Sequence, residues 1–277
     1  MTKVALHMGL MKTGTTSFQK LLQGDERLEP YVHVESFYHT SANGLPLAKI
    51  EGAQKPVFVS DENLMRAYNR VQSIDESLAY LSKLNGDVLV LVTFREQRKF
   101  LTSAYKHHIR QTSYTGSFSD WIASDAGKSQ LELCMVKGWY DKVVHYFPKE
   151  KVRVVLFEDM LSNYSEAMSE VFEHIGLDVG YDKLPVQNTG LKDISVLRKR
   201  VYNRLAKRFP GPFFGFVFRL FVLNGKLSLV RGEKELGWNE LPNATRNELE
   251  KSFSEHNAFL SQLLGRDLPK HYLNEAT

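Results

Sequence analysis

The sequence has almost no cysteine. Cys134 is the one cysteine among 277 residues, so the chain has no internal disulfide framework of the kind that stabilises small secreted domains. A chain without disulfides fits a reducing compartment, and we expect a cytoplasmic protein. The sequence also has no Cys/His cluster with the spacing of a zinc site, and we therefore expect no metal ion in its chemistry.

The excess of positive over negative charge is also small. The 36 lysine and arginine residues outnumber the 32 aspartate and glutamate residues by only four, which gives a formal net charge of +4. This excess is too small to indicate a nucleic-acid partner, and we expect none. It suits an enzyme that attracts small anions.

Long hydrophobic runs are absent. The most lipid-like segment, Phe213–Leu223 (FFGFVFRLFVL), has eleven residues and contains Arg219, whereas a helix that spans a bilayer needs about 20. We therefore expect no transmembrane segment. We interpret this segment as a buried helix or a lid, with peripheral membrane contact or self-association as the alternative. The first apolar run, Val4–Leu6, is too short for the core of a signal peptide.

Short apolar runs rich in β-branched residues recur through the first part of the chain. Such runs are typical of strands covered on both faces, and we expect strands at Val4–Met8, Pro56–Ser60, Val88–Phe94 and Val152–Phe157. Between them, apolar residues recur at helical spacing, and the last of these helices is expected to end at Gly176, a typical C-cap residue. The alternation predicts an α/β fold of three layers, with a central parallel sheet flanked by helices.

The remainder of the chain has a different character. A loop-like stretch precedes a basic helical stretch from Ile194 to Phe209, and a last helix is expected from Thr245 to Leu264. The sequence shows no internal repeat, low-complexity tract or linker, so we predict a single domain over residues 1–277. Residues 1–177 are expected to form its nucleotide-binding α/β core, and the helical residues 178–277 to complete the site.

A glycine-rich turn, Gly9–Ser17 (GLMKTGTTS), follows the first expected strand and leads into the first expected helix. Such a turn offers backbone N–H groups and the positive end of a helix dipole to a phosphate-like anion. In nucleotide triphosphatases the order is G-x-x-x-x-G-K-[ST], but here Thr15 replaces that lysine and Lys12 precedes the second glycine. This order argues against a kinase or ATPase and favours a shorter anion, bound without a metal.

The K-[ST]-G-T-[ST] order after the first strand resembles the sulfotransferase family. In that family, this loop binds the 5′-phosphosulfate of 3′-phosphoadenosine 5′-phosphosulfate (PAPS). The resemblance implies a PAPS-dependent sulfotransferase with a P-loop-type fold, similar to bacterial members and to carbohydrate sulfotransferases. The residues that it assigns to the donor are Lys12, Thr13, Gly14, Thr15, Thr16 and Ser17.

A second motif follows the third expected strand, in the sequence FREQRKFLTSAY. Arg95 stands at the carboxyl end of that strand, where open α/β sheets bind ligands, and Ser103 follows on the polar face of the next helix. This pair is similar to the 3′-phosphate motif of the family, which implies that Arg95 and Ser103 bind the 3′-phosphate of PAPS. Tyr105 also falls on the motif, whereas Gln97 replaces the proline that the family often has.

Sulfuryl transfer needs a positive charge beside the leaving phosphate and a base for the proton of the acceptor. Lys12 is the candidate for the first task, which the resemblance also implies. For the base we favour Glu62, directly after the second expected strand, with capping of the next helix as its alternative role. Among the histidines, His107 could border the site, whereas we expect His7 to orient the loop and His108 to lie in the core.

The acceptor, the oligomeric state and one basic segment are left open. We expect transfer to a hydroxyl or an amine of a carbohydrate or another small metabolite, and the sequence does not separate O- from N-sulfation. The basic segment Lys192–Arg208 is interpreted as a solvated helix face or, alternatively, as a surface for the nucleotide or an anionic acceptor. The rival functions are a P-loop kinase that uses ATP and Mg²⁺, and a nucleotide-binding relative without catalysis.

Overall fold

The computed structural model describes most of the chain, which divides into two compact units. The described residues are 1–9, 13, 15–32, 47–60, 74–177, 193–212, 216–217 and 236–272. The first unit comprises Met1–Glu96, Met135–Asn188 and His256–Thr277, and the second comprises Gln97–Cys134 and Thr189–Glu255. The first unit contains the sheet, and the described part of the second is helical.

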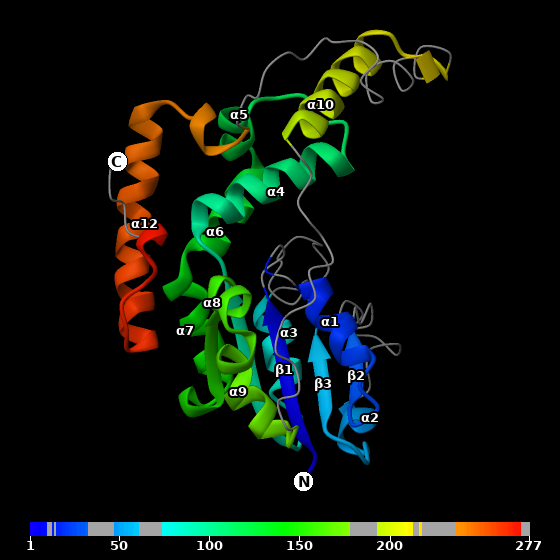
Figure 1. Cartoon of the computed structure of the whole chain (residues 1–277), viewed down its shortest axis with the longest axis vertical. Coiled ribbons are helices and arrows are strands. Elements are labelled where there is room, and N and C mark those ends of the chain that lie inside the picture. Colours follow the sequence, from blue (N-terminus) through cyan, green and yellow to red (C-terminus); the bar gives the residue numbers. More distant parts are fainter. Residues whose placement is uncertain are drawn as a thin grey trace. The chain divides into compact units, whose positions relative to one another are not determined.

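A five-stranded parallel sheet lies at the centre of the first unit (Figure 1). Its strands are β1 (Lys3–Gly9), β2 (Glu29–Val32), β3 (Val57–Ser60), β4 (Asp87–Phe94) and β5 (Val152–Leu156), in the order β2-β3-β1-β4-β5. The central strand β1 pairs with β3 on one side and with β4 on the other. The chain fills one side of β1 before it crosses to the other, so the direction of winding reverses at β1.

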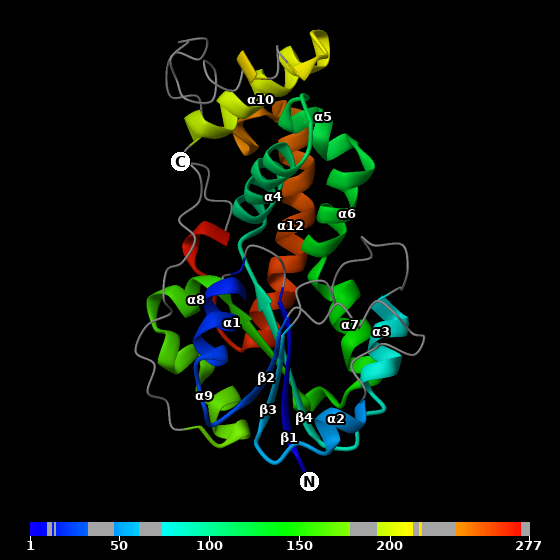
Figure 2. The ribbon, with the colours of Figure 1, turned by 90° about the vertical axis from the view of Figure 1, so that its right-hand side faces the viewer.

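Helices cover both faces of this sheet (Figure 2). On one side lie α1 (Thr15–Gln23), α8 (Phe157–Ser162) and α9 (Tyr164–Ile175), and on the other lie α3 (Ile74–Leu81) and α7 (Val136–Tyr146). The first unit also contains the short α2 (Leu47–Glu51), two 3₁₀ turns at Lys149–Lys151 and Lys270–Tyr272, and the last part of α12 (Asn243–Leu264). The unit is therefore a three-layer α/β structure, as the alternation of the sequence patterns predicts.

The core of the first unit follows the alternation of side chains along its strands. On one face, strand residues pack with apolar residues of α1 and α9 in a cluster that includes Ala5, Phe58, Leu89, Leu91, Phe18, Leu22, Met168 and Phe172. On the other face, the ring centroid of Phe94 lies 4.3 Å from that of Trp139 on α7. Because both faces are covered, the strands are nearly continuous apolar runs in the sequence.

The described part of the second unit contains helices and one 3₁₀ turn. They are α4 (Gln97–Gln111), α5 (Phe118–Ala123), α6 (Asp125–Cys134), α10 (Asp193–Arg208), the turn Trp238–Glu240 and the first part of α12. Apolar residues recur at helical spacing along α4, and the face that they form is buried; its members are Phe100, Leu101, Ala104, Tyr105 and Ile109. A capping box at Ser117 and Asp120 begins α5, so its first backbone N–H groups have partners.

The structure confirms the predicted fold class and the four predicted strands. It adds β2, which the sequence analysis missed: four residues, Glu29–Val32, with Pro30 among them. β2 is an edge strand, and an edge is where a sheet tolerates a proline. The predicted C-cap is also confirmed, because Gly176 ends α9 with a φ of 70°, in the left-handed region that glycine favours.

The predicted division into residues 1–177 and 178–277 stays a prediction. The two compact units have different bounds. Residues 97–134 belong to the second unit, and residues 256–277 belong to the first unit, which contains the sheet. Most of Phe213–Leu223 lies outside the described residues, and within it Phe216 is 62% exposed. Across the described helices, none has the length and apolar character needed to cross a membrane.

Candidate functional site

The segments that contain the predicted loop, base and Arg95 follow three neighbouring strands of the sheet in the sequence. The carboxyl ends of β1, β3 and β4 are adjacent, since Gly9 aligns with Thr93 and His7 with Ser60. The anion loop follows β1, the candidate base follows β3, and Arg95 follows β4. This edge, at the strand where the winding reverses, is where open α/β sheets bind their ligands.

A buried hydrogen-bond network connects these strand ends. The ring of His7 on β1 lies between two hydroxyl groups: Nδ1 is 2.8 Å from Ser60 Oγ on β3, and Nε2 is 3.2 Å from Thr93 Oγ1 on β4. Gln19 of α1 donates from Nε2 to the carbonyl oxygen and the hydroxyl oxygen of Ser60, at 3.2 and 3.1 Å. One imidazole ring therefore links three strands at the edge where the loop begins.

The network continues into the anion loop through Thr13. The Thr13 hydroxyl shares a hydrogen bond of 3.0 Å with Thr93 Oγ1 and one of 3.5 Å with Thr15 Oγ1, and all three threonines are buried. Thr15 is the first residue of α1, a helix of nine residues. Thr13 is thereby held against β4, two residues before the start of α1, and the N-terminus of a helix favours an anion.

Burial keeps the His7 ring neutral. The residue is 1% exposed, and the loss of hydration lowers its pKa to about 3. A neutral ring donates from one nitrogen and accepts at the other, which suits a hydroxyl on each side. At neutral pH the ring therefore has no positive charge with which to bind a phosphate. Its hydrogen bonds to Ser60 and Thr93 indicate a structural role instead.

Gly9 leaves room for this network at the last residue of β1. A Cβ atom here would lie 2.6 Å from His7 Nε2 and 2.8 Å from Thr93 Oγ1, inside normal contact distance. The first glycine of the loop is therefore required by the packing beneath it. The phosphate-loop pattern in the sequence does not reveal this reason.

The described residues include only part of the predicted site. Thr13 and Thr15 lie in the buried network, Arg95 lies in the first unit, and Ser103 lies in the second. The residues that lie outside the described part of the chain, wholly or by their side chains, are Lys12, Gly14, Thr16, Ser17 and Glu62. The roles assigned to these residues stay predictions.

Arg95 follows β4 directly and is partly buried. Its guanidinium carbon lies 5.2 Å from the ring centroid of Phe157, the first residue of α8. Burial lowers the pKa of Arg95, while the carboxylates of Glu158 and Glu96 raise it, and an arginine so placed stays charged. A charged guanidinium at the carboxyl end of a strand can bind a phosphate through two parallel hydrogen bonds.

Ser103 and Tyr105 lie on α4, and they differ in exposure. Ser103 is half-buried, whereas Tyr105 is fully buried. The Tyr105 hydroxyl donates to the carbonyl oxygen of Gly116 at 2.9 Å and accepts from Arg200 Nη1 at 2.6 Å. The tyrosine of the second motif therefore holds α4 to the segment before α5, a role that the sequence analysis did not predict.

The basic helix α10 uses part of its polar surface within its own unit. Arg200 also bonds to Glu240 Oε2 at 3.1 Å. Asn203 donates to three carbonyl oxygens at the end of α4 and in the loop after it, at 3.3, 3.1 and 3.0 Å, and Arg204 donates to another in that loop at 3.1 Å. These side chains have structural partners, which neither interpretation of the basic segment predicted.

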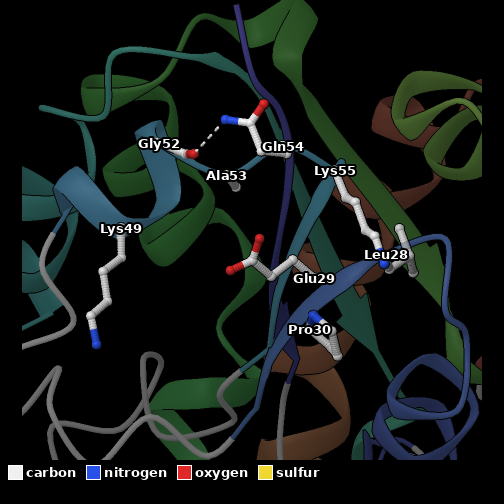
Figure 3. A pocket seen from close by; sticks show the side chains of 8 residues that line it. All are labelled: Leu28, Glu29, Pro30, Lys49, Gly52, Ala53, Gln54 and Lys55. Carbon is white, nitrogen blue, oxygen red and sulfur yellow. Dashed lines mark hydrogen bonds between the residues drawn. The ribbon is translucent and has the colours of Figure 1, made fainter.

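A surface pocket of about 590 Å³ lies at the opposite edge of the sheet (Figure 3). Its lining comes from the start of β2, from Lys49 of α2 and from residues 52–55 before β3; Leu28, Glu29 and Pro30 form the first part. The amino ends of parallel strands are not where open α/β sheets bind their ligands. We therefore do not assign this pocket to the nucleotide.

Similar solved structures include three sulfotransferases. A sulfotransferase from Alicyclobacillus acidocaldarius has a TM-score of 0.59 and 14% identity over 97% of both chains. The mouse sulfotransferase SULT7A1 complexed with PAP has a TM-score of 0.43 and 14% identity, over 95% of this chain and 87% of that one. The sulfotransferase domain from the curacin biosynthetic pathway has a TM-score of 0.46 and 10% identity, over 97% and 99%. No family model and no curated protein matches the sequence. The chain has the fold of the Alicyclobacillus sulfotransferase.

Proposed function

We propose that this chain is a PAPS-dependent sulfotransferase that acts on a hydroxyl or amine of a carbohydrate or another small metabolite. One observation carries the proposal: the loop with Lys12 and the strand-end Arg95 follow neighbouring strands, β1 and β4, at the carboxyl edge of a parallel sheet. PAPS has an anionic group at its 5′ end and another at its 3′ position, and a basic residue follows each of these two strands in the sequence. The fold shared with the Alicyclobacillus sulfotransferase supports the same proposal.

The proposed reaction is an in-line transfer. The acceptor oxygen or nitrogen attacks the sulfur, the bond from sulfur to the bridging phosphate oxygen breaks, and adenosine 3′,5′-bisphosphate (PAP) leaves with the electron pair of that bond. In this scheme Lys12 and the N–H groups at the start of α1 stabilise the negative charge on the leaving phosphate. Glu62 takes the proton of the acceptor. Ser103 keeps its predicted contact with the 3′-phosphate.

The buried network gives this proposal a structural basis. Thr93 on β4 shares one hydrogen bond with Thr13 of the loop and another with His7, while Ser60, the other partner of His7, ends β3 two residues before Glu62. Hydrogen-bond donors that are fixed in advance stabilise developing charge without the cost of reorganisation. The scheme assigns no step to a metal ion.

Thermal unfolding with nucleotides tests the donor. PAP should stabilise the protein by RT ln(1 + [L]/Kd), about 2.7 kcal/mol at a hundredfold excess over Kd, and ATP with Mg²⁺ should not. Arg95→Ala should lose most of this stabilisation. Arg110→Ala, which removes an exposed arginine from α4, should retain it. Stronger stabilisation by ATP with Mg²⁺ would indicate the rival kinase and contradict the proposal.

Glu62→Gln tests the base. The variant should bind PAP as the wild type does, and it should form sulfated product at least about 100-fold more slowly, because general base catalysis typically contributes that much. Product formation is measured with labelled PAPS across glycans, phenols and amines. Full activity would place the base elsewhere, with His107 as the next candidate. Binding of PAP by the wild type without product from any acceptor would favour the non-catalytic relative.

A further inference from the structure

Beside Arg95 lies a cluster of side chains that the proposed reaction does not use. They come from two segments of the first unit, the first turn of α8 and the last described residues of the chain. The Tyr272 hydroxyl donates to Glu158 Oε2 at 2.7 Å, and Arg266 forms an ion pair with Asp159. One polar contact therefore connects the 3₁₀ turn Lys270–Tyr272, called the C-terminal turn below, to the start of α8, and Arg266, just before this turn, makes the second.

The Glu158 carboxylate also reaches the residue that follows Arg95. Its second oxygen, Oε1, accepts the backbone N–H of Glu96 at 3.3 Å, so both carboxylate oxygens have donors. The adjacent Phe157 presents its ring to the Arg95 guanidinium at 5.2 Å. The start of α8 therefore supports Arg95 with an aromatic ring and the next peptide with a carboxylate.

Burial and two hydrogen bonds of its backbone hold Tyr272 in place beside this carboxylate. It is 3% exposed, its N–H donates to the Pro269 carbonyl at 2.8 Å, and its carbonyl oxygen accepts from Asn257 Nδ2 at 2.8 Å. Burial, and then the charge of Glu158, raise the pKa of the Tyr272 phenol, so its hydroxyl stays protonated and donates. A hydrogen bond from a buried hydroxyl to a carboxylate is among the stronger hydrogen bonds in proteins.

We propose that Tyr272 and Glu158 are positioning residues for Arg95, so that the C-terminal turn sets the affinity of the site for the 3′-phosphate of its nucleotide. This inference rests on the proposed function, because it assigns Arg95 to that phosphate. The negative charge of Glu158 attracts the Arg95 guanidinium, while Glu158 Oε2 accepts the Tyr272 hydroxyl. When that hydroxyl is removed, Oε2 becomes available to accept a hydrogen bond from Arg95. A guanidinium paired with a carboxylate binds a phosphate less well, because the two anions compete for the same N–H groups.

Titration with two nucleotides tests this role. PAP and AMP share the adenosine and the 5′-phosphate, and only PAP has a 3′-phosphate, so the ratio of their dissociation constants reports the Arg95 contact. Tyr272→Phe removes one hydroxyl and should lower the preference for PAP over AMP roughly two- to thirtyfold, the range by which mutations that act through another residue modulate coupling, with AMP affinity unchanged. Tyr140→Phe, the same change at another buried tyrosine of the unit, should leave the preference as it is.

A double-mutant cycle with Arg95→Ala identifies the route of the effect. In the Arg95→Ala background, Tyr272→Phe should not change the preference for PAP further, because the group that it positions is gone. Thermal unfolding shows whether each variant is folded at the titration temperature. Should Tyr272→Phe be unfolded there, Phe157→Leu tests the same support through the aromatic ring, and the same selective loss of PAP affinity is expected.

An equal loss of PAP and AMP affinity in Tyr272→Phe overturns the proposal, and so does an unchanged preference for PAP. An effect of Tyr272→Phe that persists without Arg95 also overturns it. Failure of the proposed function has a different outcome, because the wild type would then bind PAP no more tightly than AMP, and both proposals would fall together. If the wild type prefers PAP and Tyr272→Phe retains that preference, the result contradicts only the role given to Tyr272, and the proposed function stands.

Discussion

Gly9, the last residue of β1, shares a crowded space with the ring of His7 and the hydroxyl of Thr93. The Thr93 hydroxyl shares hydrogen bonds with both His7 and Thr13 of the anion loop. A side chain at position 9 would therefore affect the loop indirectly, because it would displace the side chains of His7 and Thr93. The effect should appear both in stability and in nucleotide binding, since one network serves both.

Gly9→Ala should lower the free energy of unfolding by about 1–3 kcal/mol, as overpacking in a tightly packed interior does, and should weaken PAP binding. Urea unfolding and PAP titration measure the two effects. Gly138→Ala is the matched control, because nothing lies within 4 Å of the added Cβ atom and the site is in α7. Alanine there should stabilise the helix by up to about 1 kcal/mol. The same response from both variants would contradict the role given to the space around Gly9.

Among the elements, α10 illustrates how a polar helix is held by a few specific contacts. Asn203 is 3% exposed, and the two hydrogens of its amide serve three backbone carbonyl oxygens at the end of α4 and in the loop after it. A buried carbonyl that loses its donor costs more than the hydrogen bond itself contributed. The amide of Asn203 and the guanidinium of Arg200, which bonds to Tyr105, therefore both connect α10 to α4.

Asn203→Ala should therefore lower the free energy of unfolding by about 1–3 kcal/mol. Asn203→Asp, of nearly the same shape, should cost at least as much, because a carboxylate has no hydrogen to donate to a carbonyl. Lys207→Ala, at an exposed position of the same helix, should change stability by less than about 0.5 kcal/mol. Urea unfolding followed by circular dichroism compares the three, and a loss in Asn203→Ala no larger than in Lys207→Ala would show that the amide is not needed.

For the whole molecule, the buried His7 makes stability depend on pH. Its pKa falls from the usual 6.5 to about 3 in the folded chain because the ring is buried. Between these values the unfolded chain binds a proton that the folded chain does not. The contribution of His7 is therefore fully present above pH 6.5, and it declines as the pH falls towards 3, by about 1.4 kcal/mol per pH unit.

From pH 7 to pH 5, the wild type should lose about 2 kcal/mol of unfolding free energy through His7. His7→Asn, which retains a donor and an acceptor but does not titrate, should be less stable at pH 7 and should lose less over the same interval. His145→Asn, at an exposed position of α7, should lose as much as the wild type. Urea unfolding at the two pH values measures the difference. Equal losses in the wild type and in His7→Asn would show that the ring is not the buried neutral group described above.

Much of the fold and part of the site can be predicted from local sequence. The four short apolar runs, the glycine turn after the first of them and the arginine after the third are each encoded within about ten residues, and the parallel sheet brings the carboxyl ends of β1, β3 and β4 to one edge. β2 is different, because its four residues carry no pattern of their own and form a strand only beside β3. The tyrosine of the second motif is also different, since its structural role depends on Arg200, 95 residues away.

The sequence by itself determined the α/β class and the positions of β1, β3, β4 and β5, because apolar periodicity is a property of short segments. It also names the candidate anion-binding residues, whose roles stay predictions. The tertiary structure alone decided which side chains support those residues. His7 meets Ser60 and Thr93 across 53 and 86 residues, and Glu158 meets Tyr272 across 114. Such pairs form because strand register and helix packing place distant side chains within hydrogen-bonding distance, and no local pattern contains that information.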